Sequence, residues 1–184
     1  MDTRVSDVLR RIEAILIETV PAAIQGARLS EPVYCLRIWY NGTDSDSDAI
    51  PWLMPVKEAT RQAILKKAKG RFPEGIWLAD ELTNVGQAFN VDIKNAELTE
   101  QYGLWYEHLA EQDDEEDLQL FREMVQRVSA ALNRLDWSAL APVTDDFVVF
   151  PADGSHTFGD DLEDLRASVP ADRLQLLKSR KLWK

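Results

Sequence analysis

The stretch VYCLRIWY, residues 33–40, decides the fold of this chain. Its β-branched and aromatic side chains are typical of strands. Pro32 precedes it, and the turn-forming pair Asn41-Gly42 follows it. Because apolar side chains occupy both alternating faces except at Arg37, the stretch predicts a central strand that is covered on both sides. A charge inside such a strand must be paired or must reach the rim of the sheet.

Other short apolar stretches supply partners for this strand. Residues 50–56, IPWLMPV, predict a returning strand whose two prolines limit its pairing. FVVF, residues 147–150, predicts a buried strand that is followed by the turn PADGS. GIWLA (75–79) and FNVDI (89–93) are two further candidates for short strands. Together these stretches predict a small sheet of about four strands, mainly antiparallel or mixed.

Apolar residues recur at helical spacing along most of the remaining chain. Residues 5–19 form an apolar stripe that ends ahead of Pro21, which disfavours helix at the residues before it, although the pattern also allows a further turn through Ile24. The longest stripe runs from Leu118 to Leu135 and predicts a long amphipathic helix near 114–135. Further helices are expected at 57–69, at about 97–111 and, once or twice, between Asp160 and Trp183. We therefore expect one α+β domain that spans residues 1–184.

Charge is distributed very unevenly along the chain. The net charge is −11, and residues 91–172 carry twenty acidic against five basic side chains. From Arg173 onward there are five basic residues and no acidic ones. An acidic surface repels nucleic acid and anionic membranes, whereas it attracts basic proteins. The expected partner is therefore a protein with a basic surface, and neither nucleic acid nor a membrane.

Two acidic runs are the candidate partner-binding segments. Both precede predicted helices, where carboxylates cap the helix and interact favourably with its dipole. One or two acids are enough for that purpose, so the excess is available to a partner, although capping alone also explains the runs. Adjacent aromatic residues on the preceding helix are typical anchors of a protein interface. The candidate residues are Asp113, Asp114, Glu115, Glu116, Asp117, Asp160 and Asp161, with Trp105 and Tyr106 as aromatic anchors.

No catalytic, cofactor-binding or metal-binding residue is predicted. The glycine-rich phosphate loops, the nucleophile elbow and the zinc-protease motif are all missing from the sequence. Asp44, Asp46 and Asp48 match the start of a calcium loop, but Ala49 stands where the loop needs glycine, and Pro55 where it needs glutamate. A solvated turn explains these aspartates better.

Two alternatives to a binding domain remain open. The first is a hydrolase-like or metal-assisted enzyme with a site near Asp153 and His156, in the loop after the predicted strand. Adjacency in sequence does not establish the geometry of a catalytic triad, so this alternative has only weak support. The second is a scaffold or regulatory subunit. Cys35, the single cysteine, falls within the predicted central strand and fits a packing role in a reducing compartment, so a cytoplasmic location is expected.

The order of these features resembles small bacterial domains found in toxin-immunity loci. The resemblance is carried by the amphipathic N-terminal helix, the strand VYCLRIWY, a mid-chain aromatic helix with GLWYEH, the long amphipathic helix and the segment TDDFVVFPADG. It covers most of the chain and implies an acidic, cytoplasmic protein that neutralises a toxin by direct binding. It implies no catalytic residues. In that case the acidic helical region would face a basic toxin surface.

Overall fold

A computed structural model describes residues 3–40, 50–69, 73–78, 90–112, 115–153 and 161–184. These residues fold around one four-stranded sheet with the strand order β3-β2-β1-β4. The strands are β1 (Val33–Tyr40), β2 (Trp52–Lys57), β3 (Val91–Asp92) and β4 (Val143–Asp153). β1 pairs antiparallel with β2 and parallel with β4, so VYCLRIWY is a central strand of a mixed sheet. The predicted α+β class and the four-stranded sheet are confirmed.

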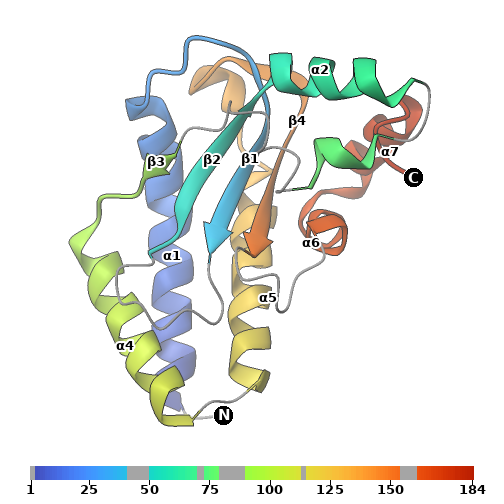
Figure 1. The fold of residues 1–184 in the computed structure, drawn as a ribbon. Helices are drawn as coiled ribbons and strands as arrows, with labels where there is room; N and C mark the ends of the chain where they lie inside the picture. Colours follow the sequence, from blue (N-terminus) through green and yellow to red (C-terminus); the bar gives the residue numbers. More distant parts are fainter. Residues whose placement is uncertain (1–2, 41–49, 70–72, 79–89, 113–114, 154–160) are drawn as a thin grey trace.

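Two helices, α1 (Thr3–Gly26) and α5 (Glu115–Leu132), cover one face of the sheet, and a third, α4 (Ala96–Gln112), packs beside them (Figure 1). They share a core with the strand residues Leu36, Ile38 and Leu53. α1 and α5 extend past the ends of the strands, and α4 packs against that extension. Phe121 lies at the junction, because its ring contacts those of Tyr40, Tyr102 and Trp105.

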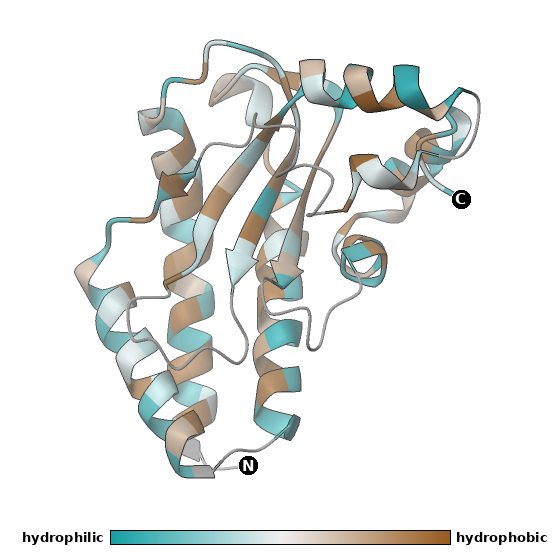
Figure 2. Ribbon diagram, viewed as in Figure 1, coloured by the Kyte–Doolittle hydropathy of each residue, from teal (hydrophilic) through white to brown (hydrophobic). Residues whose placement is uncertain are grey.

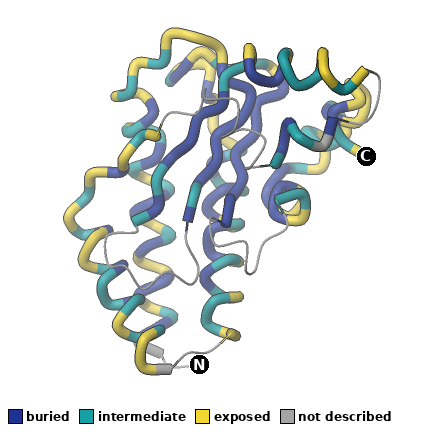
Figure 3. The backbone as a smooth tube through the Cα atoms, viewed as in Figure 1, coloured by how far each residue is buried: buried dark blue, intermediate teal, exposed yellow. Residues whose placement is uncertain are grey.

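The other face of the sheet carries shorter elements: α2 (Glu58–Ala68), the 3₁₀ turn η1 (Glu74–Ile76), α6 (Asp161–Ser168) and α7 (Ala171–Ser179). Their apolar side chains form a second core with Cys35, Met54 and Phe150. The C-terminal residues belong to this core, since the buried Trp77 donates its Nε1 hydrogen to the carbonyl of Leu182 at 2.7 Å. A further 3₁₀ turn, η2 (Trp137–Ala139), leads from α5 into β4. Figure 2 shows apolar residues on the inner sides of both layers, and Figure 3 shows the strands buried between them.

Several boundaries differ from the predicted ones for identifiable reasons. α1 continues through Pro21 to Gly26, because the buried Val20 and Ile24 hold its last turns against the core. Residues 75–79 were predicted as a candidate strand, but Glu74–Ile76 form a 3₁₀ turn, Ile76 and Trp77 are buried, and Ala79 lies outside the described residues. β4 does not turn at Pro151 but extends to Asp153, since its parallel pairing with β1 continues to that residue.

The long helix is also shorter than its apolar stripe indicated. α5 ends at Leu132, and Leu135 is 42% exposed, although the stripe included it. The chain must turn here to reach β4, and Trp137 closes the turn by donating its Nε1 hydrogen to the carbonyl of Leu132 at 2.8 Å. Pro170 precedes the first residue of α7, close to its predicted place in a first helical turn.

Candidate functional site

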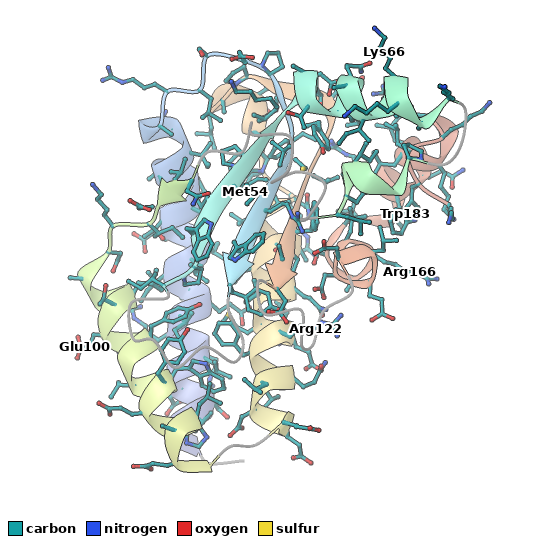
Figure 4. All side chains as sticks on the ribbon, viewed as in Figure 1. Met54, Lys66, Glu100, Arg122, Arg166 and Trp183 are labelled. Carbon is teal, nitrogen blue, oxygen red and sulfur yellow. The ribbon has the colours of Figure 1, made fainter. Side chains whose placement is uncertain are left out.

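The most acidic part of the described surface lies on α4 and on the first turn of α5. Residues 95–121 contain nine Asp and Glu residues and no Lys or Arg. α4 buries Leu98, Tyr102 and Trp105, so its acidic residues lie on the opposite side. Figure 4 shows Glu100 on the outer side of this helix. We call the exposed residues of this region the acidic surface: Glu100, Glu107, Glu111, Glu115 and Glu116.

Two other carboxylates of this region are hydrogen-bonded within the protein. Glu97 accepts hydrogen bonds from Arg11 of α1 at 2.5 and 2.8 Å, and this pairing lowers the pKa of Glu97. Asp117 lies 2.5 Å from the Nε2 atom of His108, which joins α5 to α4. Asp117, a predicted partner-binding residue, is therefore part of a helix–helix contact, and its side chain is only 13% exposed.

The predicted aromatic anchors occupy different environments. Trp105 is buried, 2% exposed, with its ring stacked on Phe121 at a centroid distance of 5.4 Å. It contributes to the core and not to the surface. Tyr106 is half-buried and packs against the same core. Trp77 and Trp137 are buried as well, so much of the aromatic content serves the two cores instead of a surface patch.

Asp161 lies apart from the acidic surface and serves as the counter-ion of a buried arginine. Arg37 is 0% exposed, and its Nη2 atom donates to Asp161 Oδ1 at 2.7 Å. The guanidinium carbon lies 5.2 Å from the ring centroid of Phe150 and 5.8 Å from that of Trp39. A charge inside a central strand was expected to be paired, and the partner of Arg37 is a carboxylate 124 positions away in the sequence. Asp113, Asp114 and Asp160 fall outside the described residues.

A second buried charge cluster was not predicted from the sequence. Asp164 is fully buried and accepts hydrogen bonds from Arg122 Nε and Gln126 Nε2 of α5, both at 2.8 Å. Burial raises the pKa of this carboxyl group. In the sequence Asp164 is one of several acids before a helix, so capping was the obvious explanation. The i, i+4 spacing of Arg122 and Gln126 is the only signal that pointed to a shared acceptor. The cluster joins α6 to α5.

Of the residues named for the enzyme alternative, the structure describes only Asp153. Asp153 lies at the end of β4 and is 3% exposed. Ser155, His156 and the aspartates 44–48 lie outside the described residues. Within the described part of the chain, no group of three or more His, Cys, Asp or Glu side chains is arranged to hold a metal ion. Cys35 is buried, and burial raises the pKa of its thiol to about 12.

No described helix is long and apolar enough to cross a bilayer. Comparison with known proteins adds no function: no family model matches the chain, and no curated protein or solved structure is significantly similar to it.

Proposed function

We propose that this chain is a protein-binding domain that engages a basic partner through the acidic surface of α4 and α5. In the form suggested by the resemblance to toxin-immunity domains, the partner is a toxin that the chain neutralises by direct binding. The supporting observation is the run of nine acidic residues without Lys or Arg across residues 95–121, five of which are exposed on adjoining helices.

Association of the acidic surface with a basic partner is expected to be fast and sensitive to salt. Charges of one sign on a single surface raise the rate of encounter with an opposite charge, and salt screens this attraction over about 8–10 Å. Helix capping accounts for the acids next to the start of α5. It does not account for Glu100 and Glu107, which lie inside and along α4.

The test compares two variants with the same change in net charge. The surface variant carries Glu107→Gln, Glu111→Gln and Glu116→Gln, and the control carries Glu18→Gln, Asp92→Asn and Asp172→Asn, three exposed acids elsewhere. A partner is first captured from the source cells and purified. Association rates are then measured by stopped flow at low and at physiological salt.

We expect the surface variant to associate about tenfold more slowly at low salt than the control, with a smaller difference at physiological salt. Equal rates for the two variants would exclude the acidic surface as the binding site. If the partner is a toxin, co-expression of the unaltered chain should restore growth, and the surface variant should restore it less well. A scaffold role predicts binding without any such protection.

A further inference from the structure

The described sheet ends at β4, whose outer side faces away from β1. Figure 1 shows β4 as the last strand of the sheet, next to α6. A strand at such an edge carries backbone N–H and C=O groups that can pair with another chain. Alternate residues of a strand direct these groups to the same side. Val149 directs both of its groups outward, and Phe147 and Pro151, two positions before and after it, belong to the same outward set.

The side chain of Asn133 occupies the middle of this edge as a neighbouring strand would. Its Nδ2 atom donates to the carbonyl of Val149 at 2.7 Å, and its Oδ1 atom accepts from the N–H of Val149 at 2.8 Å. One side-chain amide thus makes the pair of bonds that a residue of an added strand would make. The same Nδ2 atom donates to the carbonyl of Ser168, the last residue of α6, at 3.0 Å. Asn133 therefore closes the edge and joins it to α6.

The part of the edge before Val149 is closed by Arg173 of α7. Its Nη1 atom donates to the carbonyl oxygens of Asp145 and Phe147, at 3.0 and 2.9 Å. After Val149, the outward position is Pro151, which has no N–H to donate to an added strand. Side chains and one proline therefore occupy or remove the bonding groups along this edge.

Hydrogen-bond satisfaction alone does not explain these two side chains. Among the described residues, no backbone group of residues 161–184 bonds to β4, although α6 and α7 contact it. Asn133 and Arg173 are only half-buried, so water could satisfy the same backbone groups in their place. The strand that they border, FVVF at 147–150, is uncharged and rich in β-forming residues, which is the composition most prone to pairing with another chain.

We propose that Asn133 and Arg173 replace the bonds of a missing strand and so keep a second copy of this chain from pairing along β4. Every copy carries the same edge, and two identical edges pair antiparallel about a two-fold axis. The net charge of −11 opposes such pairing at low salt, whereas high salt screens the repulsion. This inference does not depend on the acidic surface.

The test compares three double variants. The open-edge variant carries Asn133→Ala and Arg173→Ala. The control carries Asn90→Ala and Arg166→Ala, two exposed residues outside β4 that make none of these bonds and give the same change in net charge. The lysine variant carries Asn133→Lys and Arg173→Ala, so that it loses the amide pair with Val149 but places a charge at the edge, which blocks strand pairing.

Circular dichroism reports whether each variant is folded, sedimentation velocity at high salt gives its mass, and hydrogen exchange follows the Val149 amide. We expect only the open-edge variant to double its mass as the concentration rises. In dilute solution its Val149 amide should exchange about tenfold faster than in the control, and it should regain protection in the dimer. If this variant does not fold, Asn133→Ala alone is measured, with the same faster exchange and weaker association expected.

Three results would overturn the proposal. A folded open-edge variant that stays monomeric at every concentration would show that the two side chains only satisfy backbone groups. Equal association of the lysine variant would mean that lost stability, and not the β4 edge, causes it. A dimer whose Val149 amide stays unprotected would place the contact elsewhere. None of these results bears on the acidic surface, because that test changes different residues.

Discussion

Arg37 is enclosed on every side within the sheet that VYCLRIWY forms. Its guanidinium lies over the rings of Phe150 and Trp39, and among the described residues it has one carboxylate oxygen, that of Asp161, within hydrogen-bonding distance. No described residue accepts a hydrogen bond from its Nε or Nη1 atom. A buried charge with so few acceptors depends heavily on the one that it has, because its water shell has been removed. The Asp161 side chain is 13% exposed, so the pair is not fully shielded from solvent.

Asp161→Ala should lower the free energy of unfolding by about 3 kcal/mol, because it leaves the Arg37 charge buried without its counter-ion. In an Arg37→Met background the same change should lower the free energy of unfolding by less than about 1 kcal/mol, since no buried charge then needs a counter-ion. Urea unfolding of the four proteins measures both values. A loss that is the same in the two backgrounds would show that Asp161 stabilises α6 by other means.

The labelling rate of Cys35 reports directly on the opening of the second core. Its side chain is 0% exposed, and burial raises the pKa of the thiol to about 12, so almost no thiolate forms at neutral pH. We expect a thiol reagent to label the native protein at pH 8 only as fast as the second core opens, and to label it at once in strong denaturant. Because Cys35 is the only cysteine, the absorbance change reports on this site alone. Rapid labelling without denaturant would contradict its buried position.

Asp145 makes stability depend on pH in a defined direction. Its hydrogen bonds from Arg180 lower its pKa from 3.8 to about 2. A lowered pKa in the folded state contributes stability above pH 3.8, and this contribution is lost as the pH falls toward 2. The stability difference between the unaltered chain and Asp145→Asn should therefore shrink between about pH 4 and pH 2, as measured by urea unfolding. A difference that grows as the pH falls would refute the pairing.

At the scale of elements, the sequence best predicted the strands and helices whose bounds depend on a local pattern of residues. β1 has the predicted bounds because apolar residues fill both of its faces and turn residues flank it. GIWLA has strand-like composition, yet its first two residues belong to a 3₁₀ turn, and Ile76 and Trp77 pack in the second core. The pairing of β1 with β4 and the contact of Arg37 with Asp161 join distant segments, so no local pattern predicts them. Composition predicted an acidic segment over residues 91–172, but of the acidic surface only Glu115 and Glu116 were among the predicted residues. The burial of Trp105 depends on Phe121 of another helix.

Substitutions at and beside Pro21 measure how far packing overrides helix propensity. α1 continues through it although proline donates no hydrogen bond to the carbonyl four residues earlier. Pro21→Ala should raise the free energy of unfolding by about 1 kcal/mol, since the gained hydrogen bond outweighs the greater freedom of the unfolded chain. The neighbouring exposed Ala22→Gly should lower it by about the same amount. A loss with Pro21→Ala would mean that the proline ring contributes needed packing.

At the scale of the whole molecule, one sheet separates two cores. The first core lies under α1, α4 and α5, and the second under α2, α6 and α7. The cores share every long strand, because alternate residues of β1 and β4 point to opposite faces. The acidic surface belongs to the first layer.

The shared strands lead us to expect that both layers unfold together. Val128→Ala in the first core and Leu177→Ala in the second each remove a side chain that is 0% exposed, at a cost of about 2–3 kcal/mol. Each should shift the same single urea transition, whether this is followed by circular dichroism or by Cys35 labelling. The loss in the free energy of unfolding of the double variant should equal the sum of the two single losses, because the two sites share no contacts. If Leu177→Ala instead exposes Cys35 ahead of a later helical transition, the second layer unfolds on its own. The prediction of one domain over residues 1–184 would then be wrong.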